Sequence, residues 1–157
     1  MANAAAQAAI SQYQMRSESP STAKLTDPGR LHITLAFLGN VDHTQEARLS
    51  SQLANVPMTP LYLKLRGAEM FSKGIAVLRV EENRDLEHLQ GDIAALVHRL
   101  GIPLDSRPWL PHITIAREAM RCMVPKESST IELDDIEAAY ELFGHQRDGM
   151  LKVAITP

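Results

Sequence analysis

The spacing of apolar positions predicts most of the regular elements of the chain. Residues 84–100 place apolar side chains three and four residues apart, which predicts a helix with one buried face. The alanine-rich residues 1–15 also predict a helix, because alanine is the strongest helix former. Alternating or mostly apolar segments predict strands at 31–40, 61–66, 74–81 and 108–118.

Turn and capping residues separate these elements. Asp42 followed by Gln45 is a capping-box pattern, so we expect a helix that runs to about Ala54. Gly101 and Pro103 end the 84–100 helix. Loops or turns are expected at 16–30, 68–74 and 119–130, and further strands at 130–143 and after a turn at Asp148-Gly149. Because helices and strands mix without regular βαβ alternation, we expect an α+β fold in a single domain over 1–157.

One short motif occurs twice, as His-Ile-Thr-Leu-Ala at 32–36 and His-Ile-Thr-Ile-Ala at 112–116. Its recurrence indicates two related lobes. On a strand, residues i and i+2 face the same way, so each copy presents a histidine and a threonine together and turns its apolar side chains to the core. By this alternation Ala36 and Ala116 should extend the polar face and leave room for a ligand, while Phe37 should lie on the core side.

Paired imidazoles are suited to concerted proton transfer. Histidine titrates near pH 6.5, so one of His32 and His112 can accept a proton from water while the other donates one to a leaving oxygen. Thr34 and Thr114 can donate hydrogen bonds to a phosphate, and Arg117 can supply positive charge. The set fits hydrolysis of a phosphodiester without a metal or other cofactor.

Other interpretations of these residues remain open. A single His-x-Thr is more often structural than functional, and the second copy is what favours a site. A metal site would need three or four ligands, whereas only two histidines are paired and no HExxH or His-x-His occurs. Phe71 could stack on a nucleobase or simply pack. Trp109 could line the rim of the site or fill the core.

Composition narrows the choice of partner and compartment. The 157 residues (17.4 kDa) carry a net charge of −3, which argues against a broad nucleic-acid-binding surface but allows a small phosphate pocket. One cysteine excludes an intrachain disulfide. No apolar run approaches the roughly 20 residues that span a bilayer, and no signal-peptide pattern is present. We therefore expect a cytoplasmic protein, acting as a monomer.

The two motifs with their flanks resemble those of a known family. His32 to Gly39 and Pro111 to Arg117, together with the preceding amphipathic helix and the lead-in Arg107-Pro108-x-x-Pro111-His112, are similar to the two-histidine (2H) phosphoesterases. The closest resemblance is to the RNA 2′,3′-cyclic phosphodiesterases, also called 2′-5′ RNA ligases. It extends from about Leu25 to the C-terminus.

The resemblance implies a fold of two similar lobes, each of antiparallel sheet plus helices, around a central cleft. It implies opening of an RNA 2′,3′-cyclic phosphate to a 2′-phosphate, with the reverse reaction joining ends through a 2′-5′ linkage. His32 would then protonate the leaving 3′ oxygen and His112 would activate water. Thr34, Thr114 and Arg117 would hold the phosphate.

The chain departs from the family pattern at its start, where an apolar strand is usual and an alanine-rich segment stands instead. The first family strand is therefore expected to be absent. Two further functions remain open at this stage. One is hydrolysis of another small cyclic phosphate, which the acidic pI favours, and the other is a module that only binds RNA ends or phosphate.

Overall fold

The structure is a computed structural model that describes residues 4–16, 23–57, 59–118, 131–136, 140–144 and 151–155. The described chain contains three α-helices: α1 (Ala4–Arg16), α2 (His43–Leu53) and α3 (Arg84–Arg99). It also contains eight strands: β1 (Lys24–Leu25), β2 (Ile33–Phe37), β3 (Leu61–Phe71), β4 (Ile75–Val80), β5 (His112–Arg117), β6 (Ile131–Ile136), β7 (Tyr140–Gly144) and β8 (Leu151–Ile155).

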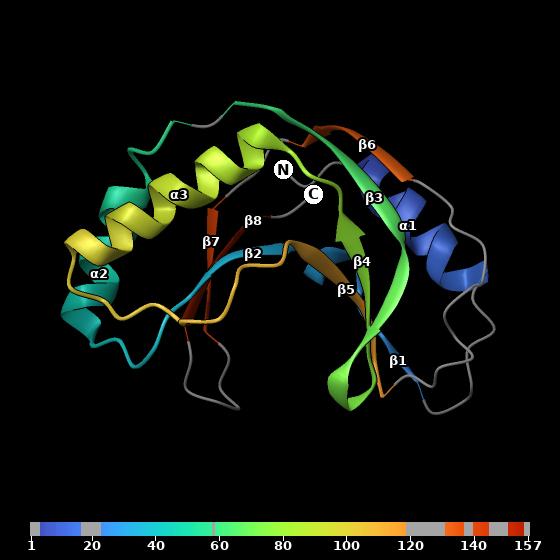
Figure 1. Cartoon of the computed structure of the whole chain (residues 1–157), viewed down its shortest axis with the longest axis horizontal. Coiled ribbons are helices and arrows are strands. Elements are labelled where there is room, and N and C mark those ends of the chain that lie inside the picture. The colour runs from blue at the N-terminus through green and yellow to red at the C-terminus, as the bar shows by residue number, and fades with distance from the viewer. Residues whose placement is uncertain are drawn as a thin grey trace.

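All eight strands join one antiparallel sheet in the order β6-β3-β4-β5-β2-β8-β7, with the short β1 added to β5. The two strands that carry the repeated motif, β2 and β5, are neighbours at its centre. Figure 1 shows α2 and α3 together at one end of the molecule and α1 at the other, near β3 and β6. The α+β class and the antiparallel sheet with helices are confirmed.

Side chains cap the first turns of α2 and α3, and the cap of α2 is the one that its sequence predicts. The side chain of Asp42 accepts from the backbone N–H of Gln45 at 2.8 Å, and the Gln45 side chain accepts from the Asp42 N–H, which completes the capping box. At the start of α3, the side chain of Asn83 accepts from the backbone N–H of Leu86 at 2.9 Å. The helix stops at Gly101, whose φ of 69° is one that glycine adopts without steric cost.

The core lies between these helices and the sheet. It is built almost wholly from aliphatic side chains. The largest fully buried ones are Ile10, Leu31, Ile33, Leu35, Leu38, Leu49, Leu63, Leu65, Leu78, Leu86, Ile93 and Ile113. The predicted apolar face of α3 (Leu86, Leu89, Ile93, Leu96 and Val97) is buried as expected.

The expected loop at 16–30 contains the short strand β1, and two predicted strand boundaries differ from the structure by four residues or more. Strand β3 continues to Phe71, and the turn is confined to Ser72–Gly74, because a register shift after Leu65 lets the pairing with β4 continue through Ala68. Strand β5 begins at His112 and not at 108, since prolines 108 and 111 have no N–H to donate to a ladder. The predicted loop at 119–130 and the turn at Asp148-Gly149 lie outside the described residues.

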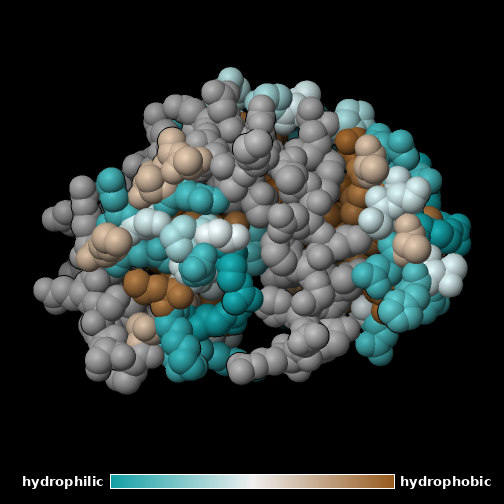
Figure 2. Space-filling model, turned by 180° about the vertical axis from the view of Figure 1, so that it is seen from behind, coloured by the Kyte–Doolittle hydropathy of each residue, from teal (hydrophilic) through white to brown (hydrophobic). Residues whose placement is uncertain are grey.

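On the face shown in Figure 2, the described residues are mostly hydrophilic, and their apolar atoms are exposed in separate places. Among the described residues, no helix is long and apolar enough to cross a membrane.

The capping box gives a direct test of the fold. Replacing Asp42 with Ala should lower the free energy of unfolding by about 1 kcal/mol, because the N–H of Gln45 loses its acceptor. Urea denaturation would measure the loss. The exposed Ser51→Ala substitution in the same helix is the control and should change the free energy by less than about 0.5 kcal/mol. Equal losses in both variants would contradict the capping role.

Candidate active site on two neighbouring strands

The two His-x-Thr motifs lie side by side in opposite directions. Ile33 of β2 is paired with Ile113 of β5, and both are fully buried. Extending this antiparallel register by one residue each way brings His32 level with Thr114, and His112 level with Thr34. The four polar side chains therefore share one face of the sheet, related by an approximate twofold axis through the isoleucine pair.

The two imidazoles are held in the same way. Nδ1 of His32 lies 2.7 Å from the carbonyl oxygen of Arg30, and Nδ1 of His112 lies 2.6 Å from that of Leu110. A carbonyl oxygen can only accept, so each Nδ1 must carry a proton. In the neutral ring the lone pair is then on Nε2. Both rings are prepared to exchange a proton through the same nitrogen.

Burial differs among the polar side chains of the motifs. Thr34 is only 9% exposed, whereas His32, His112 and Thr114 are half-buried, and Arg117 is exposed. The imidazoles can therefore be reached by a small molecule.

A β-bulge in each motif corrects the simple alternation. Thr34 and Ala36 are opposite consecutive residues of β8, so Leu35 is an extra residue in its strand. Thr114 and Ala116 are opposite consecutive residues of β4 in the same manner, which makes Ile115 the extra residue there. After a bulge of this kind, every later side chain in the strand points to the face opposite the one that strict alternation would give it.

The expected facing of three residues is therefore wrong or incomplete. Ala36 and Ala116 belong to the buried core and do not extend the polar face. Phe37 is turned to the face of the histidines, where it is half-buried, and not to the core. Arg117 reaches the same face because of the bulge, since strict alternation from His112 would have turned it away.

Phe71 lies next to the second motif. It is the last residue of β3, and its ring packs edge-on against the His112 ring, with centroids 5.0 Å apart at 62°. The contact fixes Phe71 at the site while engaging part of its surface in packing.

The hydrogen bond of Trp109 and the presence of Arg79 at the site were not predicted. The indole N–H of Trp109 donates to the carbonyl oxygen of Thr34 at 2.9 Å, which ties the lead-in of the second motif to the strand of the first. Arg79 of β4 is directly opposite His112, so its side chain shares the histidine face. Its guanidinium is 3.6 Å from Glu69, and its buried Nε has no hydrogen-bond partner within the described residues.

The signals for these two residues were weak. Trp109 is partly buried against the core, which is one of its two expected positions, and its indole N–H is in addition a polar anchor between the motifs. Arg79 is a half-buried arginine in an otherwise apolar strand, but only the register of β4 with β5 identifies His112 as its neighbour.

The lead-in to the second motif carries an exposed ion pair. The Arg107 guanidinium binds the Asp105 carboxylate, and the backbone N–H of Arg107 donates to the same side chain at 3.0 Å. These hydrogen bonds hold the pKa of Asp105 below its usual value. The backbone N–H of Asp105 also donates to the Phe37 carbonyl at 3.3 Å, which joins this segment to the end of β2.

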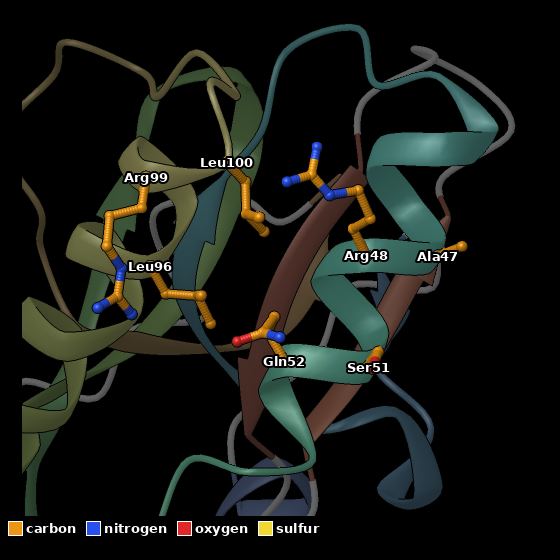
Figure 3. Close-up of a pocket in the computed structure, with 7 residues that line it drawn as sticks. All are labelled: Ala47, Arg48, Ser51, Gln52, Leu96, Arg99 and Leu100. Carbon is orange, nitrogen blue, oxygen red and sulfur yellow. The ribbon is translucent and has the colours of Figure 1, made fainter.

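A separate cavity of about 510 Å³ lies between α2 and α3. Figure 3 shows its lining residues: Ala47, Arg48, Ser51, Gln52, Leu96, Arg99 and Leu100. It has no histidine, carboxylate or thiol to transfer protons, and its two guanidinium groups lie well apart. The residues that line this cavity therefore offer no side chain for acid–base chemistry near neutral pH.

The described residues contain no group of three His, Cys, Asp or Glu side chains that could hold a metal ion. The expectation that the reaction needs no metal or cofactor stays a prediction.

Comparison with known proteins identifies relatives along most of the chain. The family model described as the 2′-5′ RNA ligase superfamily matches residues 3–139. An RNA 2′,3′-cyclic phosphodiesterase of Bacillus subtilis (strain 168) is 30% identical over 134 residues, covering 77% of this chain and 73% of the relative. The enzyme of the same name from Archaeoglobus fulgidus is 30% identical over 143 residues, covering 86% and 76%.

Solved structures agree on the fold. A crystal structure of E. coli LigT complexed with 3′-AMP has a TM-score of 0.67 and 22% sequence identity, covering 100% of this chain and 91% of that one. A crystal structure of a phosphoesterase has a TM-score of 0.71 and 22% identity, covering 99% and 94%.

The histidine geometry predicts one tautomer for both rings. At a pH where the rings are neutral, the ¹⁵N chemical shifts of His32 and His112 should be those of a protonated Nδ1 and an unprotonated Nε2. The exposed His88 of α3, whose neighbours impose no such bond in the described structure, serves as the reference and should populate both tautomers. A protonated Nε2 at either motif would contradict the arrangement.

Proposed function

The chain belongs to the 2′-5′ RNA ligase superfamily, and from this membership we propose that it opens the 2′,3′-cyclic phosphate at an RNA end to a 2′-phosphate. The proposed catalytic residues are His32 and His112. The observation that carries the proposal is the matched pair of imidazoles on one face, each with Nδ1 bonded to a backbone carbonyl.

The proposed reaction moves two protons. Nε2 of a neutral His112 takes a proton from water as the water oxygen attacks phosphorus. The bond from phosphorus to the 3′ oxygen breaks, and a protonated His32 gives its Nε2 proton to that oxygen. The products are a 2′-phosphate and a 3′ hydroxyl, and the two rings exchange protonation states. If the 5′ hydroxyl of a second RNA end takes the place of water, the same two proton transfers join the two ends through a 2′-5′ linkage, with the 3′ oxygen as the leaving group.

The charge that develops on phosphorus needs donors. Thr34 and Thr114 lie level with the histidines of the opposite motif, so each imidazole has a hydroxyl beside it that can donate to a phosphate oxygen. Arg117, on the same face, supplies a full positive charge. We assign these three residues to phosphate binding and Phe71 to the contact with the nucleoside.

Two alternative functions differ from this one in substrate or chemistry. The net charge of −3 favours a short substrate, so another small cyclic phosphate remains a candidate. A module that only binds phosphate is disfavoured, because binding alone does not require two imidazoles of the same tautomer.

We further propose that the enzyme works as a monomer in the cytoplasm. Both motifs come from one chain and meet on adjacent strands, so a second copy is not needed to complete the site. A single cysteine suits a reducing compartment.

The first test is turnover in the presence of a chelator. The purified protein should convert a nucleoside 2′,3′-cyclic phosphate to the 2′-phosphate at the same rate with and without EDTA, because its own side chains compensate the charge on phosphorus. Chromatography would separate the 2′- and 3′-phosphate products. Lost turnover that returns on adding zinc or manganese would argue for a metal enzyme.

The second test divides labour between the histidines. Turnover should follow a bell-shaped pH curve, because one ring must be neutral while the other is charged. His32→Ala and His112→Ala should each lower turnover by a large factor, on the order of a thousandfold or more. The double variant should turn over little more slowly than the slower of the two single variants. Near-normal turnover by His112→Ala with an intact bell would contradict the two-imidazole mechanism.

A further inference from the structure

We propose that Gln14 and Gln90 are positioning residues, which hold the bulge of each motif so that Arg117 and Phe37 stay on the histidine face. The inference rests on the proposed function. It adds to that function two side chains that act on the site without contacting the substrate.

The bulge is the same device in both motifs. The extra residue is the fourth of the motif in each case, Leu35 in β2 and Ile115 in β5. In each case a glutamine from a helix donates its side-chain N–H to the carbonyl oxygen of that residue. The two helices lie at opposite ends of the molecule (Figure 1). Both the irregularity and the polar contact therefore follow the same approximate twofold symmetry as the histidines.

Gln14 of α1 makes the stronger version of this contact. It is only 4% exposed, and its Nε2 lies 2.8 Å from the Ile115 carbonyl and 3.0 Å from that of Thr26. Both hydrogens of the amide are used. The Thr26 N–H also donates to the Ile115 carbonyl at 2.9 Å. Burying an amide without such hydrogen bonds would cost stability, so the side chain of Gln14 favours the backbone arrangement in which both carbonyls are in reach.

Gln90 of α3 makes the weaker version. Its Nε2 lies 3.4 Å from the Leu35 carbonyl, and the side chain is half-buried. Because Gln14 is more buried and makes the shorter hydrogen bond, its loss should lower kcat/KM more than the loss of Gln90.

The bulge matters because it decides what faces the phosphate. With the bulge, Ile115 and Ala116 are both buried and Arg117 is exposed on the side of His112 and Thr114. In a regular strand the side chain of Arg117 would alternate to the other face, away from His112. Whatever holds the bulge therefore holds the guanidinium in place.

The experiment is a double-mutant cycle on the opening of a nucleoside 2′,3′-cyclic phosphate. Gln14→Met keeps the length of the side chain and removes the donor. It should lower kcat/KM by about ten- to a hundredfold, the loss expected when a catalytic group is misplaced by about 1 Å. Arg117→Met should lower kcat/KM by at least the same factor. The double variant should be no slower than Arg117→Met alone, because Gln14 acts through Arg117.

A matched control separates positioning from damage to the helix. Gln12→Met alters an exposed glutamine of the same helix and should keep wild-type kinetics. Wild-type kinetics for Gln14→Met, losses that multiply in the double variant, or an equal loss for Gln12→Met would each overturn the inference.

Two further measurements keep the test decisive. If Gln14→Met fails to fold, the cycle of Gln90→Met with Phe37→Leu applies the same logic to the first motif. If the wild-type protein opens no cyclic phosphate, the proposed function fails by itself, and the backbone amide chemical shifts of residues 114–117 still test the bulge. These shifts should move in Gln14→Met and stay in place in Gln12→Met, and unchanged shifts in both variants would overturn the positioning role.

Discussion

The pairing of β2 with β5 through Ile33 and Ile113 is the contact on which the site depends. The two histidines are 80 positions apart in the chain, and only this antiparallel join brings them to one face. Because both isoleucines are fully buried, a slip of the register by one residue would expose apolar side chains and bury the imidazoles. The burial of the core therefore fixes the geometry of the chemistry. Trp109 reinforces the join from outside the ladder, through its bond to Thr34.

Much of the fold was predictable because it is encoded locally. The capping box at Asp42, the apolar face of α3 and the alternation around His32 and His112 all act over a few residues, and each matches an element of the structure. The family resemblance of the two motifs agrees with the family model and with the relatives of known name. The assignment of individual site residues stays a prediction.

The bulges were not predictable, because what stabilises them is distant. The Ile115 carbonyl is bonded by Gln14, 101 positions earlier in the chain, and nothing in His-Ile-Thr-Ile-Ala signals an extra residue. Alternation alone turned Ala116 to the polar face and Phe37 to the core, and both assignments were wrong for this one reason. For helix α1, too, the element was predictable but its contacts were not. Its sequence predicts a helix, but the pairing of Gln14 with β5, and of the Tyr13 hydroxyl with the Ala68 N–H at 3.1 Å, depends on tertiary packing.

The backbone around the two histidines is nearly symmetric, so the surroundings of the two imidazoles differ only through the neighbouring side chains. Equivalent positions after the bulges carry a ring in one motif, Phe37, and a guanidinium in the other, Arg117. Arg79 adds a second guanidinium opposite His112, although Glu69 offsets part of its charge. Two guanidinium groups therefore share the face of His112, whereas Phe37 brings no charge to the equivalent position of the first motif. A scaffold with two similar motifs can thus serve an asymmetric reaction, because its backbone repeats the geometry while the side chains beside each imidazole differ in charge.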